Sequence, residues 1–389
     1  MAFNSSKLDP VVVVGGGFAG LNTVVALSQY ELRPEIVLID PHPRFVFLPL
    51  LFELLSGEIQ YWEVAPPYKY LLAERGISFL QESAEKIDIN SKEIFTSSGL
   101  SLKYSQLVLS TGSVPKDCGI KGFSKYTITF NSLEDVSRLR DLINDIKKSC
   151  HSPKSLVIVG AGLTGVELSC KLADLLKDYC EIYLIELGER VLSQGKSFNQ
   201  EQAESALGKR AVKVHLKTRV LAISSDEIFL ESLQGGKQQN FSLPHNGVVW
   251  TGGARPCIPK LNPACQLHEG KLPVDECMQV IGFQDVLAIG DIASHTHEPW
   301  PSNAQVAIQQ GKAAAQVLMD IKAGKPPTAF KFFDFGEMLS LGVGNATITG
   351  LGLTISGPLA FQIRRITYLM RMPRFDFAFR LTGAWLLGN

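Results

Sequence analysis

Two glycine triplets with the spacing Gly-x-Gly-x-x-Gly are the residues of this sequence best suited to chemistry. The first triplet is Gly15, Gly17 and Gly20, and the second is Gly160, Gly162 and Gly165. In such a triplet the first glycine permits a tight turn and the second lets the backbone approach a pyrophosphate. The third lets a helix pack close to a strand. Each triplet therefore predicts a binding site for one dinucleotide.

The segments around each triplet supply the rest of a nucleotide-binding pattern. The expected elements are strands 11–14 and 36–39 with helix 21–30, and strands 156–159 and 182–185 with helix 166–176. The second strand of each set ends in an acid, Asp40 or Glu186, where a carboxylate can accept hydrogen bonds from ribose hydroxyls. This order, present twice, predicts an α/β fold with two Rossmann-like dinucleotide-binding domains. The economical pair of ligands is a tightly bound FAD and an exchangeable NADH or NADPH that reduces it.

Three further stretches are typical of this layout. "LVLSTGSVP" (107–115) and "VVWTGGARP" (248–256) are apolar strands followed by Thr-Gly, and they look like paired crossings between a flavin domain and an inserted nicotinamide domain. Their candidate cofactor residues are Thr111, Gly112 and Gly252. "DVLAIGDIA" ends in Gly290 and Asp291, and in the two-dinucleotide flavoprotein reductases that it resembles this Asp holds the ribityl hydroxyls. The alternative for Asp291 is a simple helix N-cap.

These stretches predict the domain boundaries. Residues 1–115 and 252–325 form a discontinuous FAD-binding domain, 116–251 an NAD(P)H-binding domain, and 326–389 a C-terminal appendage. The size is consistent with two to three domains.

Composition narrows the class of protein. Lys+Arg and Asp+Glu are equal at 38 each, so we expect no nucleic-acid partner. The seven cysteines include no Cys-x-x-Cys pair, which indicates reduced thiols in a cytosol-like compartment, and we expect no metal site. We expect no signal peptide and no transmembrane helix, because the uncharged stretch 338–363 is rich in glycine and threonine and favours a β-hairpin.

The residues after Asp40 bear on the electron acceptor. Disulfide reductases of this architecture carry a redox cysteine pair there, whereas "DPHPRFVFLPLLFELLSGEIQYW" has no cysteine. Its apolar side chains, such as Phe45 and Phe47, could cover the flavin ring or line an acceptor pocket, or could simply pack in the core. Farther on, Gln305 and Gln309 share one face of an alanine-rich helix, where neutral amides can donate to quinone carbonyls. The alternative is that both glutamines face solvent.

These motifs resemble the type II NAD(P)H:quinone oxidoreductases, which are single-chain, non-pumping, membrane-peripheral flavoenzymes. The resemblance covers both fingerprints and "FLPLLFELLSG", "TGVEL", "WTGGARP", "AIGDIA" and "AQVAIQQ". It implies that Gln305 and Gln309 lie on the quinone side and that Glu167 lies near the contact of nicotinamide and flavin. The alternative for Glu167 is a structural acid near a helix N-terminus. "FGEMLSLG" and "GPLAFQIRRITYLMRMP" look closer to the cyanobacterial and plastid demethylphylloquinone reductase branch, which implies a naphthoquinone substrate in phylloquinone (vitamin K1) synthesis.

The C-terminal residues 361–389 combine five arginines with many aromatic and aliphatic side chains and one acid. A basic amphipathic segment of this kind suits the surface of an anionic membrane, where a lipophilic quinone resides. We therefore expect a peripheral membrane protein on the cytoplasmic or stromal face of a plasma or thylakoid membrane. The alternatives are that these side chains form a homodimer interface or cap the flavin domain.

Rival functions stay open at this point. One is a general respiratory NADH dehydrogenase that reduces plastoquinone, ubiquinone or menaquinone, and another is a ferredoxin or rubredoxin reductase. A third is a flavoprotein without enzymatic activity. For the coenzyme, Glu186 favours NADH while Arg190, four residues later, favours NADPH, and we expect both to work with a modest preference for NADH.

Overall fold

The structure is a computed structural model that describes residues 9–149, 154–236, 238–372 and 382–383. The chain divides into two compact units. The first comprises Met1–Phe45, Ala65–Val114 and Arg255–Asp334, and the second Val46–Val64, Pro115–Ala254 and Phe335–Asn389. The units separate close to the two expected crossings, and both the 46–64 segment and the C-terminal part group with the second unit.

The first unit is built on an eight-stranded sheet with the order β22-β19-β20-β21-β7-β1-β2-β3. Its strands are β1 (Val11–Val14), β2 (Ile36–Ile39), β3 (Ile77–Leu80), β7 (Gln106–Leu109), β19 (Leu272–Val274), β20 (Gln279–Val280), β21 (Phe283–Ala288) and β22 (Ala293–His295). The central strand β1 pairs in parallel with β2 and β7, and all four of its valines are buried. A continuous run of β-branched residues is what a strand covered on both faces requires.

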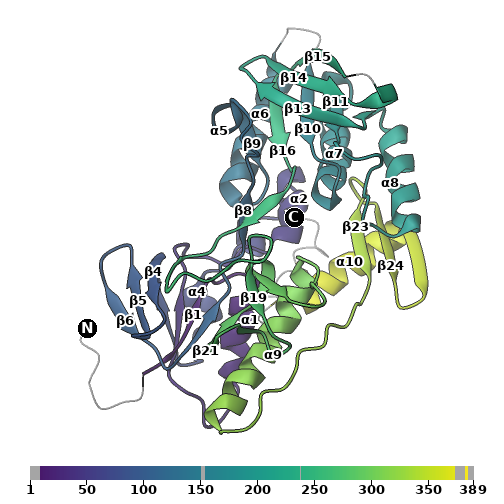
Figure 1. Cartoon of the computed structure of the whole chain (residues 1–389). Coiled ribbons are helices and arrows are strands. Elements are labelled where there is room, and N and C mark those ends of the chain that lie inside the picture. Colours follow the sequence, from purple (N-terminus) through teal and green to yellow (C-terminus); the bar gives the residue numbers. More distant parts are fainter. Residues whose placement is uncertain (1–8, 150–153, 237, 373–381, 384–389) are drawn as a thin grey trace. The chain divides into compact units, whose positions relative to one another are not determined.

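Two helices of the first unit lie along each other beside this sheet (Figure 1). These are α1 (Phe18–Leu27) and α9 (Ala304–Lys322). Smaller elements are α4 (Tyr68–Leu71), the turn η4 (Gly290–Ile292), and a four-stranded sheet of β18 (Lys260–Asn262), β4 (Ala84–Asp88), β5 (Glu93–Thr96) and β6 (Ser101–Lys103). At the crossings, β8 (Ser113–Pro115) pairs with β17 (Ala254–Pro256).

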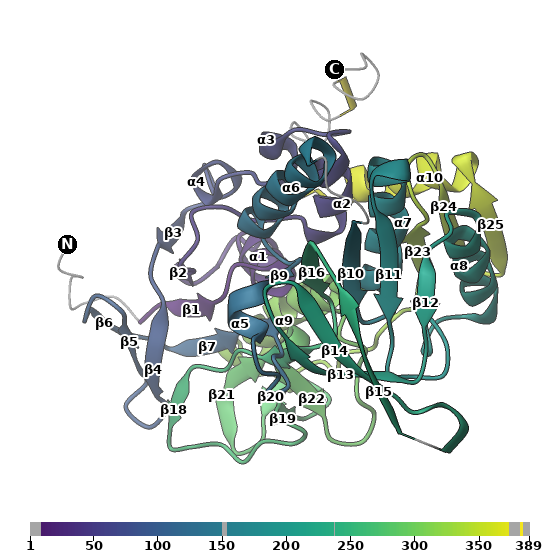
Figure 2. The ribbon, with the colours of Figure 1, turned by 90° about the horizontal axis from the view of Figure 1, so that it is seen from above.

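The second unit repeats the parallel arrangement in a five-stranded sheet with the order β12-β11-β10-β16-β9. Its strands are β9 (Thr127–Thr129), β10 (Ser155–Val159), β11 (Glu181–Ile185), β12 (Lys213–His215) and β16 (Gly247–Trp250). A second sheet consists of β13 (Thr218–Ile223), β14 (Glu227–Ser232) and β15 (Gln239–Pro244). Side chains of both sheets share one core, and Figure 2 shows β10, β11 and β12 side by side.

Helices complete the second unit. They are η1 (Leu48–Leu50), α2 (Leu51–Ser56), α3 (Tyr61–Val64), α5 (Phe123–Tyr126), α6 (Leu133–Lys148), α7 (Leu163–Leu176), η2 (Lys177–Tyr179), α8 (Ser197–Lys209), η3 (Gln234–Gly236) and α10 (Pro358–Met370). Helix α7 follows β10 as α1 follows β1, so the two fingerprints occupy equivalent places in the two units.

The hairpin expected in the uncharged stretch is confirmed. Strands β24 (Ala346–Gly350) and β25 (Leu353–Gly357) form it, and β23 (Glu337–Ser340) adds a third antiparallel strand. Helix α10 begins directly after the hairpin and packs on it through Ala360 and Phe361. Among the described residues, no helix is both long and apolar enough to cross a membrane.

Both fingerprint helices begin three residues earlier than predicted. The third glycine of each triplet, Gly20 or Gly165, lies inside the first helical turn rather than before it. Glycine disfavours a helix interior, which is why the pattern suggested a later start. A β-carbon on either residue would overlap the carbonyl oxygen of the first glycine, so close packing requires glycine there.

Candidate functional site

The first fingerprint contains glycines required by the fold and one glycine that the fold does not require. Gly15 has φ +99°, and a β-carbon there would overlap the backbone of Ser110. At Gly17, by contrast, φ is −64° and an added β-carbon would meet no atom within 4 Å. This open space lies at the N-terminus of α1, where backbone amides favour a phosphate. The residues present therefore fit a dinucleotide pyrophosphate.

Three side chains brace this glycine turn. One carboxylate oxygen of Asp40 accepts from the Gly16 amide at 2.6 Å, and the other accepts from the His42 amide at 2.8 Å. The Ser110 hydroxyl lies 2.9 Å from the Gly15 carbonyl oxygen, and Tyr68 donates to the Gly16 carbonyl at 2.7 Å. The turn is thus held in shape by the protein itself. Asp40 lies at the end of β2, as predicted.

The second fingerprint uses the same devices. Gly160 also has φ +99°, while an added β-carbon on Gly162 would meet nothing within 4 Å. Glu186 accepts from the Ala161 amide at 2.6 Å, as Asp40 does from Gly16. Thr251 donates to the Gly160 carbonyl at 2.9 Å, in the place of Ser110. The second unit therefore fits a second dinucleotide.

The other candidate flavin residues lie in the first unit. Asp291 accepts from the Ser113 hydroxyl at 2.6 Å, and the Gly290 amide donates to the buried amide oxygen of Gln310 at 2.7 Å. The N-cap alternative fails for Asp291, because it lies in the short turn η4 and the N-cap of α9 is Asn303.

The candidate residues at the crossings contact neighbouring segments of the protein. Thr111 donates to the carbonyl of Cys257, and Gly112 accepts from the amide of the same residue at 2.9 Å. Gly252 lies against the Trp250 ring and next to Gly160. Their candidate roles as cofactor ligands stay predictions.

The two glutamines lie at the start of α9, as the helix pattern predicted. Gln309 exchanges two hydrogen bonds with the backbone of Phe333, at 2.9 and 3.0 Å. Its amide therefore anchors the segment that follows α9, an engagement that the sequence did not suggest. Gln305 is half-buried one turn earlier.

Glu167 is a buried acid on α7. It accepts from the Ser340 amide at 2.7 Å, and its carboxylate lies 3.7 Å from the Arg364 guanidinium. Burial raises the pKa of Glu167 to about 7, against a partial lowering by Arg364. A carboxyl with this pKa can bind or release a proton near neutral pH.

The raised pKa of Glu167 predicts how the stability of the folded protein depends on pH. Between pH 4.5 and 7 the folded protein holds a proton on Glu167 that the unfolded chain releases, so stability falls as pH rises through this window. The loss amounts to about 3 kcal/mol above pH 7. Glu167→Gln should remove this loss, so that urea unfolding at pH 8 requires more denaturant in the variant while the two proteins unfold alike at pH 4.5. If the free energy of unfolding changed between pH 4.5 and pH 8 by the same amount in Glu167→Gln as in the parent protein, Glu167 would not be the group responsible.

The burial of individual side chains bears on the apolar segment after Asp40 and on the basic C-terminal segment. Phe45 and Phe47 are buried, as the core-packing alternative requires, and a role in covering the flavin stays a prediction. Arg364, expected on a basic membrane-facing segment, is wholly buried and ion-paired with Glu53 of α2, and that expectation is wrong. Arg365 and Arg371 are half-buried, and Arg374 and Arg380 lie outside the described residues.

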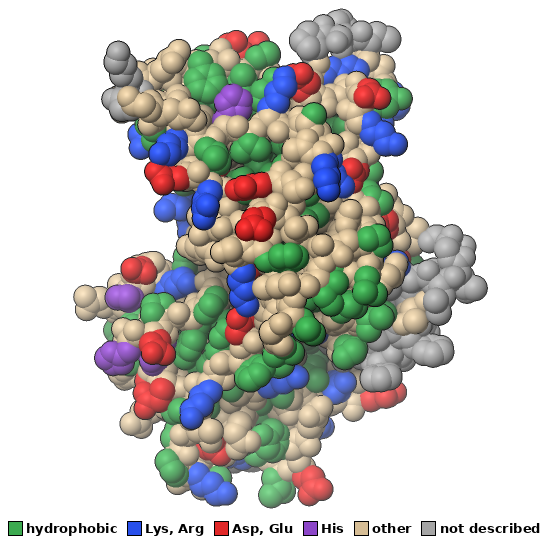
Figure 3. All heavy atoms as spheres, turned by 90° about the vertical axis from the view of Figure 1, so that its right-hand side faces the viewer, with side chains coloured by type: hydrophobic (Ala, Val, Ile, Leu, Met, Phe, Trp, Pro, Cys, Tyr) green, Lys and Arg blue, Asp and Glu red, His purple; other side chains and the backbone are tan. Residues whose placement is uncertain are grey.

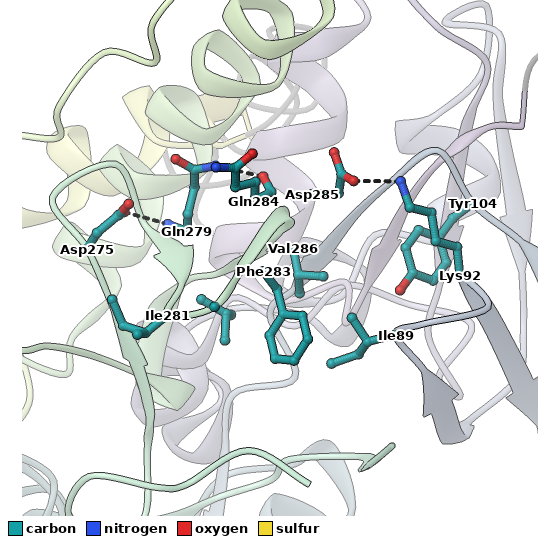
Figure 4. Close-up of a pocket in the computed structure, with 12 residues that line it drawn as sticks. Ile89, Lys92, Tyr104, Asp275, Gln279, Ile281, Phe283, Gln284, Asp285 and Val286 are labelled. Atoms are coloured by element: carbon teal, nitrogen blue, oxygen red, sulfur yellow. Dashed lines mark hydrogen bonds and ion pairs between the residues drawn. The ribbon is translucent and has the colours of Figure 1, made fainter. Parts of the chain in front are cut away.

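A hollow of about 590 Å³ in the first unit does not coincide with either fingerprint (Figure 4). Residues at the start of β21 line the hollow, whereas Gly290 and Asp291 follow the end of that strand. At its rim Lys92 pairs with Asp285 at 2.5 Å. We therefore do not assign it to a dinucleotide.

Cysteine and metal expectations can be compared with the described residues. The six cysteines within them are free thiols. The same residues contain no group of three or more His, Cys, Asp or Glu side chains able to hold a metal ion.

The sequence reading missed Ser110, Thr251, Tyr68 and Gln310. The first two carried a usable signal, because a hydroxyl residue follows the strand next to each fingerprint. Tyr68 and Gln310 carried none, since each reaches its glycine only through the tertiary fold.

Comparison with known proteins gives the family. The family model described as pyridine nucleotide-disulphide oxidoreductase matches residues 9–311. Demethylphylloquinone reductase NdbB of Synechocystis sp. is 33% identical over 97% of this chain and 95% of its own length. The chain belongs to the type II NADH:quinone oxidoreductase family.

A second relative and a solved structure support this assignment to the type II family. The alternative NAD(P)H-ubiquinone oxidoreductase C1 of Arabidopsis thaliana, chloroplastic/mitochondrial, is 29% identical over 98% of this chain and 81% of its own. The fold matches NDH2 from Plasmodium falciparum in complex with NADH, with a TM-score of 0.89, 98% of both chains covered and 16% identity. The protein is an NAD(P)H:quinone oxidoreductase with two Rossmann-like sheets, and the family implies FAD.

Proposed function

We propose that this type II enzyme uses NADH or NADPH and FAD to reduce a lipophilic naphthoquinone, demethylphylloquinone, by two electrons. The repeated fingerprint is the observation that supports binding of two cofactors. In each unit there is open space at the second glycine, and an acid holds the glycine turn through a backbone amide. The choice of quinone is supported by similarity to the Synechocystis reductase, which spans nearly the whole of both chains.

The chain's own residues position the reactants. The α1 turn, Asp40 and Asp291 would hold FAD, and the α7 turn with Glu186 would hold the nicotinamide coenzyme. Bound FAD would supply the two-electron relay between coenzyme and quinone. Gln305 and Gln309 would donate hydrogen bonds on the quinone side, and Glu167 would exchange a proton. No side chain need act as a nucleophile.

The test is identification of the quinone that co-purifies with the protein, followed by steady-state assays. Demethylphylloquinone, plastoquinone, ubiquinone and a small iron–sulfur protein should be compared with NADH and NADPH. We expect the highest kcat/KM with demethylphylloquinone. A preference for plastoquinone or ubiquinone would favour the second candidate, a general respiratory dehydrogenase, which the name of the Arabidopsis relative supports. Turnover of the iron–sulfur protein alone would overturn both.

Glutamine variants test the acceptor side. Gln305→Leu should leave reduction of the flavin by NAD(P)H unchanged and slow reoxidation by quinone about 2- to 13-fold, the worth of one neutral hydrogen bond. Gln309→Leu should do the same and also free the Phe333 segment, so it should lower the thermal midpoint where Gln305→Leu does not. Stopped-flow measurement of the two half-reactions separates these effects. Equal slowing of both half-reactions would argue against a quinone-side position.

The surface of α10 supports peripheral attachment to a membrane. Leu359, Ile366 and Met370 are spaced seven and four residues apart, so they share one face, and they are 64%, 56% and 78% exposed. The nearby hairpin turn exposes Leu351 and Leu353. Figure 3 looks onto the side on which β24 and α10 lie in Figure 1, and hydrophobic side chains gather there among scattered charges. Such a face suits shallow insertion at a bilayer surface, on the cytoplasmic or stromal side, and a homodimer interface is the alternative.

Acidic substitutions on this apolar face test the attachment. Leu359→Glu/Ile366→Glu/Met370→Glu should float with anionic phospholipid vesicles about tenfold less than the parent protein, because three apolar side chains no longer leave water. Leu32→Glu is the matched control, since Leu32 is also highly exposed but lies in the first unit. Undiminished flotation of the triple variant, or a dimer that it breaks instead, would contradict membrane attachment through α10.

A further inference from the structure

Five charged side chains of the second unit lie together between α2, α7 and α10. Arg364 and Glu53 form an ion pair with side chains 1% and 3% exposed. The fully buried ammonium of Lys171 lies 2.6 Å from a carboxylate oxygen of Glu58, whose side chain is 25% exposed. Glu167 is the fifth member. It lies one helical turn before Lys171, on the same face of α7.

Counting charges singles out Glu167. Within the buried group there are two cations and three carboxyls, and each cation has its own carboxylate, Glu53 for Arg364 and Glu58 for Lys171. The half-buried Arg365 interacts with Glu58, Glu53 and Glu63 but is not among the charges that act on Glu167, so it is not counted. The group is therefore neutral only when Glu167 carries a proton. A net charge in a buried site is unfavourable, so Glu167 is the member that gains and loses a proton.

The remaining groups that face Glu167 do not alter this count. Tyr368 of α10 and Cys170 of α7 both have a pKa raised by burial, to about 12 for Cys170, and stay neutral. From β23 the Ser340 amide donates a hydrogen bond. The charges that act on Glu167 are those of Arg364, Glu53 and Lys171.

We propose that Lys171, held by Glu58, is a positioning residue for the reaction, because its buried ammonium decides the pH at which Glu167 releases its proton. The inference rests on the proposed function. Reduction of a quinone to a quinol takes up two electrons and two protons. NAD(P)H supplies two electrons and one proton as a hydride equivalent, and the second proton comes from water. Within the group, Glu167 is the acid without a cation of its own, so it is the member able to pass that proton on.

Two variants of one ion pair should act in opposite directions. Lys171→Met removes a cation and makes the group more negative, so Glu167 should keep its proton to a pH about one unit higher. Glu58→Gln leaves the Lys171 charge uncompensated, so Glu167 should release its proton at a pH about one unit lower. Lys171→Met/Glu58→Gln should return close to the parent value. A purely structural role would weaken the protein in all three variants without opposite shifts.

The experiment has two readouts. Infrared absorption of the protonated carboxyl, assigned by its absence in Glu167→Gln, is titrated with pH in the oxidised enzyme without quinone. Reoxidation of the pre-reduced enzyme by menadione is measured over the same pH range. Opposite shifts of both midpoints support the proposal. Infrared midpoints that do not move, or that move in one direction for both variants, overturn it.

The two readouts also separate this inference from the proposed function. Opposite infrared shifts with an unchanged pH profile for menadione would support the charge link and overturn the proton role of Glu167 in quinone reduction. If Lys171→Met fails to fold, Glu58→Gln still gives one direction, and Lys171→Arg, which keeps the charge, should keep the parent midpoint. A shift of that midpoint by Lys171→Arg as large as the one expected for Lys171→Met would count against the proposal.

Discussion

Valine in place of Gly17 should give a folded protein that purifies without its yellow flavin. A side chain at this position meets no protein atom, so the fold tolerates it at a cost of about 1 kcal/mol at the N-cap of α1. The same side chain fills the space that a pyrophosphate would occupy. Several charge-assisted hydrogen bonds, each worth about 1.5–3 kcal/mol, would be lost, which lowers the affinity for FAD at least about 100-fold. Absorbance at the flavin band and circular dichroism measure the two effects.

The second fingerprint provides the matched control. Gly162→Val makes the same change in the same local geometry, and should give a yellow protein that NADH and NADPH no longer bleach. The two variants should therefore have opposite phenotypes, one without flavin and one without coenzyme. A Gly17→Val protein that keeps its flavin, or a Gly162→Val protein that is bleached normally, would remove the corresponding nucleotide from that unit.

Replacing Arg364 by methionine should destabilise the protein by about 3–5 kcal/mol, because it leaves the Glu53 carboxylate buried without a partner. The guanidinium also donates to the Pro49 carbonyl at 3.1 Å and stacks over the Tyr368 ring, so its loss affects η1 and α10 as well as α2. Equilibrium unfolding in urea at pH 7 measures the change.

Two controls identify the ion pair as the cause. Arg364→Met/Glu53→Leu should recover most of the lost stability, since no uncompensated charge then remains buried. Arg365→Met, at the half-buried neighbouring position, should cost about 1 kcal/mol or less. A double variant no more stable than Arg364→Met would show that packing, and not charge, accounts for the effect.

The duplicated fingerprint could be predicted from the sequence because every part of it is local. Strand, glycines, helix and acid lie within about 30 consecutive residues, and their order follows from backbone geometry. Asp40 and Glu186 duly lie at their strand ends and contact their glycine turns. The uncharged hairpin could be predicted for a similar reason, since its turn residues adjoin its strands.

Arg364 could not be placed because its environment is set by distant residues. Its partner Glu53 is 311 positions away, and within residues 361–389 it resembles the other arginines. The helical positions alone do not tell which face of α10 meets the protein. Only packing against α2 distinguishes the buried Arg364 from the half-buried Arg365 and Arg371. The same holds for Gln309, whose bond to Phe333 depends on the path of the chain after α9.

The bracing of both glycine turns has a consequence for how nucleotides arrive. The amides of Gly16 and Ala161 are already engaged by Asp40 and Glu186, so these turns do not wait for a ligand to acquire their shape. The conformational entropy of the two turns is lost when the chain folds and not when a nucleotide binds. Apoprotein stripped of FAD should accordingly keep a receptive turn, and uptake should follow a single second-order phase whose rate rises linearly with FAD concentration, without a plateau set by slow rearrangement.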